Sequence, residues 1–220
     1  MSYITQNVEK ILLELPEGVH LEVAVKTRTA AEIEEAIGAG VKIIGENYVQ
    51  EADKIIPMIE SKCEWHFIGS IQENKINKML HLFDMIETIG TFEVAKAIDS
   101  KCKVFGRNID VLIEVNSGRE SQKSGVMPEN LNEIVKKIST LTNLKIMGLM
   151  TMGPAVSPEE LRPYFKLTKN LFDELKKMNL PNADMKILSM GMSDSYVIAI
   201  EEGANLVRIG TKIFGPRKYN

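Results

Sequence analysis

Short apolar runs alternate along this chain with longer stretches in which apolar residues recur every three or four positions. The short runs are typical of parallel strands buried on both faces, and the longer stretches predict amphipathic helices. We expect the first helix at residues 5–14, the first strand at residues 21–25 and the next helix at residues 30–39. Thr29 has the position of an N-cap residue, with Glu32 three residues later as its capping-box partner.

The same strand-and-helix unit recurs to the end of the chain. Further strands are expected at residues 42–45, 65–68, 85–89, 109–115, 144–150, 185–189 and 206–209. Further helices are expected at residues 47–59, 72–82, 92–102, 128–139, 157–178 and 193–202, with a short tail after the last strand. Such units in about 250 residues or fewer fit a (β/α)₈ barrel. An open doubly wound sheet would carry a glycine-rich fingerprint after its first strand, and this chain has none there. We predict one α/β TIM-barrel domain over residues 1–220 with an extra N-terminal helix and no second domain.

Composition narrows the class of protein. A hydrophobic share of 44% and a charged share of 26% are those of a globular protein, and a net charge of -3 gives no basic footprint for nucleic acid. No apolar run approaches the roughly 18 residues of a membrane span, and no signal peptide is visible. Cys63 and Cys102 are the two cysteines, which we expect to be buried and inert. Two thiols without an export signal indicate a cytoplasmic protein.

Polar and glycine residues crowd the ends of the predicted strands, which is where function collects in this fold. These residues are Lys26, Gly45-Glu46-Asn47, His66, Gly69, Asn116-Ser117-Gly118, Thr151-Met152, Ser189 to Ser193 and Gly210-Thr211. Lys26 closes an apolar strand, and partial burial there would favour a neutral amine that can attack a carbonyl. The alternative for Lys26 is a solvated strand-end lysine. His66 could act as a ligand or base, or be a hydrogen-bonded strand histidine.

A second cluster points to a phosphate. Ser189-Met190-Gly191-Met192-Ser193 precedes a predicted helix, and Gly210-Thr211 follows the neighbouring last strand. Backbone N–H groups at such positions bind anions, and the ends of strands seven and eight are the usual phosphate position in this fold. Simple helix capping by Ser193 is the alternative. Arg208 lies between the amine and this cluster, either facing inward toward a ring nitrogen or paired with a carboxylate.

Several short motifs stand at successive strand ends. They are Ala24-Val25-Lys26-Thr27, Ile44-Gly45-Glu46-Asn47-Tyr48-Val49-Gln50, Trp65-His66-Phe67-Ile68-Gly69, Val115-Asn116, Lys123-Ser124-Gly125, Gly148-Leu149-Met150-Thr151, Leu188-Ser189-Met190-Gly191-Met192-Ser193 and Val207-Arg208-Ile209-Gly210-Thr211-Lys212-Ile213-Phe214-Gly215. In this order they resemble the pyridoxal phosphate homeostasis protein family, relatives of the N-terminal barrel of bacterial alanine racemase. The resemblance covers nearly the whole chain. One departure is Val25, where the family usually has serine.

The resemblance implies that pyridoxal 5′-phosphate (PLP) is held as a Schiff base on Lys26, with Asn47 lining its pocket. It further implies that Ser189 and Ser193, with Gly210 and Thr211, hold the phosphate, that Met190 is also a cofactor-binding residue, and that Arg208 approaches the pyridine nitrogen. PLP-dependent apo-enzymes are the partners it suggests, and we expect a monomer that binds neither nucleic acid nor membrane. Roles for Lys75, Lys123 and Lys212 in transfer of PLP stay open.

The resemblance also implies a regulatory carrier without a reaction of its own, and two features favour this. The fixed charge of Arg208 would keep the pyridine nitrogen unprotonated and make the ring a poorer electron sink. Racemisation needs a base on each face of the substrate, and the chain ends at Asn220 without a second domain to supply one beside Lys26. A small amino-acid racemase is the second hypothesis. A Schiff-base lyase of the aldolase type is the third, with Glu46 as the obvious acid at the rim.

Overall fold

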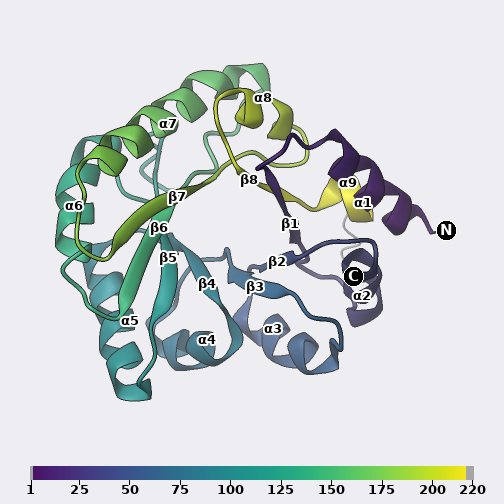
Figure 1. Cartoon of the computed structure of the whole chain (residues 1–220), viewed down its shortest axis with the longest axis horizontal. Helices are drawn as coiled ribbons and strands as arrows, with labels where there is room; N and C mark the ends of the chain where they lie inside the picture. The colour runs from purple at the N-terminus through teal and green to yellow at the C-terminus, as the bar shows by residue number, and fades with distance from the viewer. Residues whose placement is uncertain (1, 217–220) are drawn as a thin grey trace.

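The computed structural model describes residues 2–216, and its parallel strands pair in chain order into a closed barrel. Helices follow the strands and surround the barrel (Figure 1). The strands are β1 (His20–Ala24), β2 (Ile43–Glu46), β3 (Glu64–Phe67), β4 (Met85–Ile89), β5 (Ile109–Glu114), β6 (Leu144–Met150), β7 (Ala183–Ser189) and β8 (Leu206–Ile209). The predicted (β/α)₈ barrel is confirmed.

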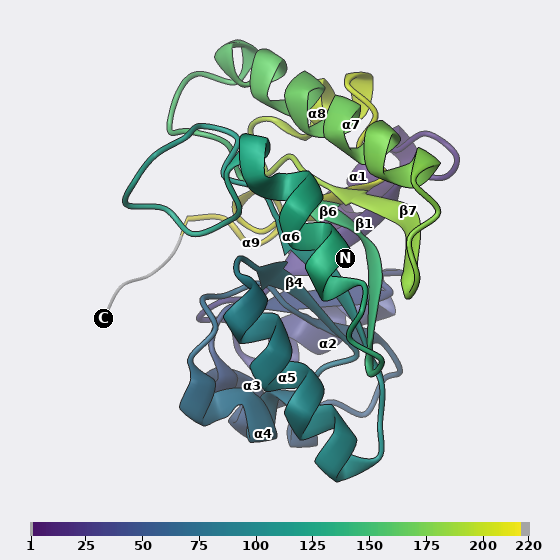
Figure 2. The ribbon, with the colours of Figure 1, turned by 90° about the vertical axis from the view of Figure 1, so that its left-hand side faces the viewer.

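The outer layer consists of helices that bury one apolar face each. The α-helices are α1 (Tyr3–Glu14), α2 (Ala30–Gly38), α3 (Val49–Ile55), α4 (Ile76–Leu82), α5 (Phe92–Phe105), α6 (Leu131–Ile138), α7 (Arg162–Lys177), α8 (Tyr196–Glu201) and α9 (Thr211–Phe214). Figure 2 shows α5, α6 and α7 side by side on one flank of the barrel. The predicted capping box is present, since the Thr29 hydroxyl accepts from the Glu32 N–H at 3.3 Å and Glu32 accepts from the Thr29 N–H at 2.8 Å.

Several predicted helices begin or end in a tighter turn. Single 3₁₀ turns take up part of the predicted helices at η1 (Ile56–Met58), η2 (Glu73–Lys75), η3 (Pro128–Asn130) and η4 (Glu159–Leu161). Proline lies at the first positions of η1 and η3, where its missing N–H costs no hydrogen bond. The predicted helix at residues 193–202 begins only at Tyr196, so the prediction was wrong by three residues there. The predicted C-terminal tail begins with the short helix α9.

Two apolar clusters stabilise the barrel. The larger lies between the strands and the helices and includes Val23, Ile44 and Val207. A small separate cluster of Met85, Leu112 and Met150 joins strands β4, β5 and β6. Charged side chains in several strands, Glu87 of β4 among them, are as deeply buried as these, which differs from the continuously apolar strands that the sequence pattern predicted.

Gly148 is required by the packing of β6 against β7. Its φ of 156° lies at the edge of the region that favours glycine, and a Cβ atom there would lie 1.7 Å from the carbonyl oxygen of Ile187. The pairing registers of β6 with both of its neighbours shift beside this residue. The close approach of the two backbones therefore depends on the absence of a side chain.

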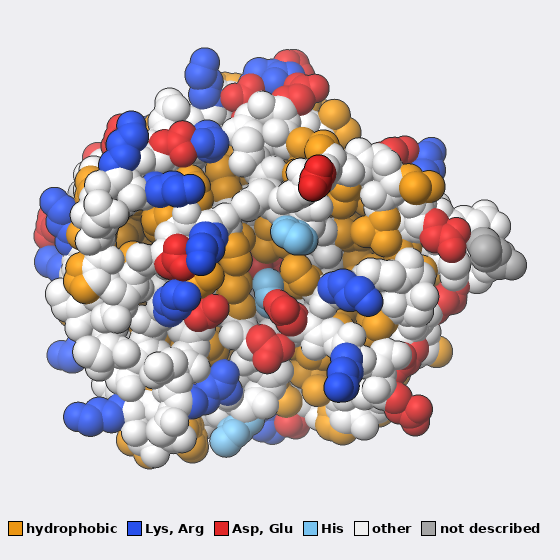
Figure 3. Space-filling model, viewed as in Figure 1, with side chains coloured by type: hydrophobic (Ala, Val, Ile, Leu, Met, Phe, Trp, Pro, Cys, Tyr) orange, Lys and Arg blue, Asp and Glu red, His pale blue; other side chains and the backbone are white. Residues whose placement is uncertain are grey.

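The surface carries interspersed charges. Blue and red side chains alternate over the face seen in Figure 1, and acidic side chains and histidine lie near its centre (Figure 3). Among residues 2–216, no helix combines the length and the apolar character needed to cross a membrane.

Candidate functional site

Lys26 lies in the turn that follows β1, two residues beyond the end of the strand. Thr27 adopts a left-handed φ of 65°, and its N–H donates to Glu51 Oε2 at 2.9 Å. The half-buried Lys26 side chain places its Nζ atom 4.6 Å from the centre of the Tyr48 ring. The turn thus directs the amine toward α3 and the space beside it.

Two cavities share Asn47, Gly69 and Ser70, and the larger of them reaches the Lys26 turn. The larger, of about 650 Å³, is lined by Lys26, Asn47, Tyr48, Val49, Gln50, Glu51, Phe67, Gly69, Ser70, Gln72 and Lys75. The smaller, of about 280 Å³, lies at the ends of the middle strands and has Glu114, Asn116 and Lys123 in its wall. Asn47 donates to the carbonyl of Ile68 at 3.3 Å, which holds its amide between the two cavities.

The loops after β7 and β8 contact each other at the same end of the barrel. The Ser193 hydroxyl accepts from the Lys212 N–H at 3.3 Å, so it lies against the start of α9. It does not cap α8, because the helix begins at Tyr196. Gly210 precedes α9, and a Cβ atom on it would lie 3.0 Å from the carbonyl oxygen of Ala24. The predicted phosphate loops and the Lys26 turn are therefore neighbours.

Arg208 faces the interior of the barrel and is almost fully buried. One terminal nitrogen donates to the Ser189 hydroxyl, and the other donates to the carbonyl of Thr151 at 2.8 Å. Ser189 is fully buried too and donates to Glu87 Oε2 at 2.7 Å. Met190 is buried, Thr211 is exposed, and both lie where the chain leaves a strand. Of the predicted site residues, Ser189 and Arg208 thus form an interior pair, and the others lie at the rim.

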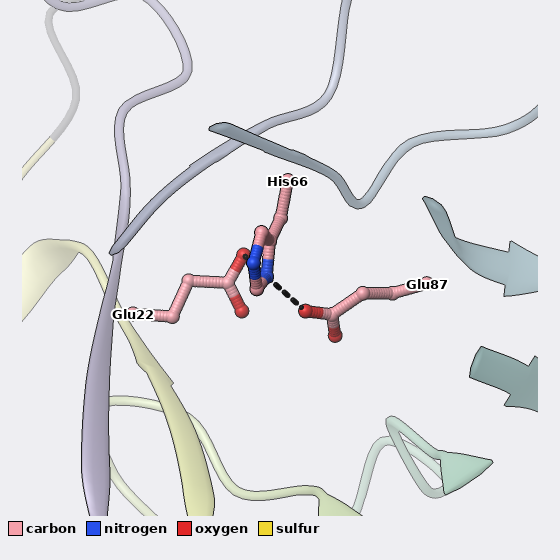
Figure 4. Close-up of side chains that lie close together, drawn as sticks. All are labelled: Glu22, His66 and Glu87. Atoms are coloured by element: carbon pink, nitrogen blue, oxygen red, sulfur yellow. Dashed lines mark hydrogen bonds and ion pairs between the residues drawn. The ribbon is translucent and has the colours of Figure 1, made fainter. Parts of the chain in front are cut away.

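Glu22, His66 and Glu87 meet inside the barrel (Figure 4). His66 Nδ1 lies 2.8 Å from Glu87 Oε1 and 3.9 Å from Glu22 Oε1, so His66 is the hydrogen-bonded strand histidine that the sequence left as one alternative. Among residues 2–216, neither oxygen of Glu22 has a hydrogen-bond partner. The three side chains also bring ligand atoms within 4.8 Å of one another, an arrangement that could hold a metal ion.

The pKa values of this group diverge because the neighbours differ. Burial opposes the charge on His66, but Glu64, Glu87 and Glu22 around the ring outweigh it and raise its pKa to about 10. Burial and the nearby charge of Glu87 raise the pKa of Glu22 well above its usual range. Burial acts on Glu87 as well, yet its hydrogen bond to His66 and the charge of Arg208 hold its pKa below the usual value. His66 and Glu87 therefore form the charged pair of this cluster, whereas the shift of Glu22 favours its neutral form.

Two further buried carboxyls lie at the rim. Burial raises the pKa of Glu46 to about 7, although the N–H groups of Tyr48 and Asn47 donate to it and oppose the rise. Burial likewise raises the pKa of Glu114 to about 7 against the opposing charge of Arg208. Glu46 binds its own turn, at 2.6 and 2.9 Å, whereas Glu114 lines the smaller cavity. A carboxyl with a pKa near neutrality in a cavity can accept or donate a proton.

The other lysines and cysteines named from the sequence differ in their surroundings. Lys75 shares the larger cavity with Lys26. Lys123 donates to the carbonyl of Gly153 at 3.0 Å, and Lys212 donates to the Tyr196 hydroxyl at 3.2 Å. Cys102 is buried as predicted, whereas Cys63 is only half-buried. Both thiols are free, and burial raises the pKa of each to about 11.

Sequence reasoning missed Glu22, Glu87 and Glu114. Each is a charged residue that interrupts the apolar residues of a predicted strand, and this interruption was the available signal. A strand buried on both faces leaves such a side chain no solvent to reach, so it must find partners inside the barrel.

Three similarities bear on the site. The family profile described as alanine racemase, N-terminal domain, matches residues 1–218. The pyridoxal phosphate homeostasis protein of Aquifex aeolicus is 44% identical over 200 residues, which cover 89% of this chain and 86% of that protein. PipY of Synechococcus elongatus PCC7942 has a TM-score of 0.91 at 31% identity in a structure without PLP, which covers 96% of this chain and 100% of PipY. With PLP bound, PipY has a TM-score of 0.88 at 30% identity and the same coverage.

Proposed function

This chain belongs to the alanine racemase N-terminal domain family and, within it, to the pyridoxal phosphate homeostasis proteins, and we propose that it binds PLP through Lys26. The observation that carries the proposal is the place of the amine. Lys26 lines a cavity of about 650 Å³. The strand that precedes it, β1, ends against Gly210 in the loop after β8, which contacts the loop after β7. A protein that holds a reactive aldehyde in this way serves PLP homeostasis.

The residues present fit the chemistry of PLP. The Ser193 hydroxyl and the backbone at Gly210 and Thr211 would hold the phosphate, because hydroxyls and free N–H groups are its usual partners in this fold. Gly210 suits this role, since its missing side chain leaves the backbone open to close approach. Met190 would support these loops from the buried side, and Asn47 would line the ring. The buried hydroxyl of Ser189 acts through Arg208, to which it is bonded.

Arg208 would determine the chemistry that the cofactor can perform. Bound PLP supplies an aldehyde and a ring that withdraws electrons from an attached carbon. Arg208 is held by Ser189 and Thr151, and its permanent charge beside the ring nitrogen would keep that nitrogen unprotonated. The ring then withdraws electrons less strongly. This supports a carrier that stores or delivers PLP over an enzyme that turns over amino acids.

A PLP-dependent racemase is the second candidate, and Glu114 is the observation that favours it. Its pKa near 7 and its place in the wall of the smaller cavity are suited to a second general base besides Lys26. The same carboxyl would suit an aldolase-type lyase better than Glu46, whose oxygen binds its own turn. We infer a non-catalytic role because the named relatives are homeostasis proteins.

The proposal is tested by trapping the bound aldehyde. The purified protein is incubated with PLP, reduced with borohydride and mapped by mass spectrometry, beside Lys26→Ala and the matched variant Lys75→Ala. We expect a pyridoxyl group on Lys26 in the wild type and in Lys75→Ala, and none at residue 26 in Lys26→Ala. An unmodified Lys26, or modification spread over surface lysines, would refute the proposal.

The carrier and the racemase are separated by proton exchange. The loaded protein is incubated with alanine in heavy water, and deuterium at the α-carbon is measured by NMR beside Glu114→Gln. We expect no exchange above that of free PLP. Exchange in the wild type that is lost in Glu114→Gln would establish the racemase instead.

A further inference from the structure

A continuous chain of buried contacts runs across the barrel behind Arg208. Arg208 of β8 donates to Ser189 of β7, and Ser189 donates to Glu87 Oε2 of β4 at 2.7 Å. The other carboxylate oxygen of Glu87 lies 2.8 Å from Nδ1 of His66 on β3. These strands are not all neighbours, so the chain crosses the interior rather than following one edge of the sheet.

The direction of each hydrogen bond in this chain is fixed by Glu87. An ionised carboxylate only accepts, so the Ser189 hydroxyl must donate its single proton to Glu87. The lone pairs of Ser189 then face Arg208, whose guanidinium only donates. Arg208 can only donate and the Glu87 carboxylate can only accept. The Ser189 hydroxyl between them therefore cannot rotate to donate elsewhere without breaking a charge-assisted hydrogen bond.

We propose that Glu87 is a positioning residue for the cofactor site, which holds Arg208 in place through Ser189 and is itself held by its hydrogen bond to His66. The proposal rests on the proposed PLP site at Arg208 and explains how that guanidinium is kept at one orientation. Thr151 fixes the second terminal nitrogen at 2.8 Å, so the two anchors together define the plane of the group.

Glu22 lies beside this series of hydrogen bonds but is not part of it. Burial and the charge of Glu87 raise the pKa of its carboxyl. Among residues 2–216 its two oxygens accept no hydrogen bond, and Oε1 lies 3.9 Å from His66 Nδ1. A Cβ atom on Gly45 would lie 2.2 Å from Glu22 Oε1, so the glycine makes room for this side chain. Glu22 and Glu87 flank the same imidazole, yet only Glu87 is joined to Arg208 by hydrogen bonds, through Ser189.

The same three side chains could instead bind a metal, but the charges nearby oppose it. Arg208 is close enough to lower the pKa of both Glu22 and Glu87, and a divalent cation would be repelled by it. His66 Nδ1 lies at hydrogen-bond distance from Glu87, so the imidazolium already occupies the place of a cation. We therefore assign the cluster to positioning.

The two buried glutamates offer a matched experiment. Glu87→Gln and Glu22→Gln are each loaded with PLP, and the dissociation constant and the visible spectrum from pH 6 to 9 are recorded. Glu22→Gln should stay within about twofold of the wild type, because it keeps the size of the side chain and Glu22 makes no hydrogen bond to Ser189 or Arg208. Glu87→Gln should weaken PLP binding about tenfold or more and shift the spectral titration, since a bond to a charged partner is lost.

A double-mutant cycle shows whether Glu87 acts through Ser189. Ser189→Ala alone should resemble Glu87→Gln, and the double variant should be no worse than the worse single one. Far-UV circular dichroism of each variant without PLP verifies that the barrel is folded. If Glu87→Gln does not fold, Ser189→Ala beside Glu22→Gln carries the same comparison.

The outcomes separate this inference from the function on which it rests. A wild type that takes up no PLP contradicts the proposed function. Two results would contradict the positioning role alone, provided that the wild type binds PLP. In the first, Glu87→Gln and Glu22→Gln bind PLP equally well. In the second, the effects of the Glu87 and Ser189 substitutions are additive. A stoichiometric divalent metal found by elemental analysis, and lost in Glu87→Gln, would overturn it in favour of a metal site.

Discussion

Replacing Glu114 with glutamine should make the barrel more stable at alkaline pH and leave it nearly unchanged at acid pH. The carboxyl is buried, and burial raises its pKa from 4.5 to about 7. Above pH 4.5 the unfolded chain releases this proton more readily than the folded chain does. Ionisation therefore favours unfolding, and the folded protein loses stability as the pH rises from about 4.5 to about 7.

The size of the effect follows from the two pKa values. At pH 8 the difference of about 2.5 units corresponds to about 3 kcal/mol against the folded state, and at pH 5 to less than about 1 kcal/mol. Glutamine has nearly the same shape and never ionises, so it removes this cost. For a chain of this size the gain in Tm should grow from roughly 2 °C at pH 5 to roughly 6–12 °C at pH 8.

Differential scanning calorimetry at several pH values measures this directly. Glu9→Gln, on the exposed face of α1, is the matched control, because an exposed charge changes stability by about 0.5 kcal/mol or less. Parallel curves of Tm against pH for the wild type and Glu114→Gln would refute the reasoning. They would show that water or a charged partner reaches the carboxyl in the folded protein.

Three further results are expected. Thr29→Ala removes a capping box and should lower the free energy of unfolding by about 1 kcal/mol, measured as a lower urea midpoint at unchanged slope. Gly148→Ala places a Cβ atom against the carbonyl oxygen of Ile187 and should prevent soluble expression or unfold at a far lower urea concentration. The His66 ring should keep the ¹³C shifts of an imidazolium at pH 8, because its pKa is raised to about 10. Its contribution to stability is complete below about pH 6.5 and is lost as the pH rises toward 10.

The strands could be predicted closely because the barrel leaves a clear pattern. Strands β4, β6 and β8 begin and end where the apolar runs do. The ends of helices were harder, since 3₁₀ turns and α-helices share the same apolar spacing over a few residues. At Ser193 a hydroxyl before an apolar stretch indicated a helix N-cap. The chain instead makes another turn before α8 begins at Tyr196, and the Ser193 hydroxyl accepts from the Lys212 N–H of α9.

The site could be predicted only in part. Its rim residues directly follow predicted strands, whereas its interior contacts join residues from strands that are far apart in the sequence. Lys26 and Gly210-Thr211 follow strands directly, so the fold alone brings them to one end of the barrel. The contacts of Glu87 depend on which strands face each other across the closed barrel and on the register of their pairing. A shift of one residue would turn Glu87 outward, and no local pattern records that register.

The buried charges also indicate which part of this barrel serves something other than stability. Apolar side chains usually fill the interior of such a barrel, as Met85, Leu112 and Met150 do in the small separate cluster. Burying Glu22, whose oxygens accept no hydrogen bond among residues 2–216, costs free energy that an apolar residue of the same size would not. The ion pair of Glu87 and His66 beside it is explained by Arg208, whose guanidinium it orients through Ser189. A fixed orientation of this guanidinium matters only if a ligand at the rim interacts with its charge.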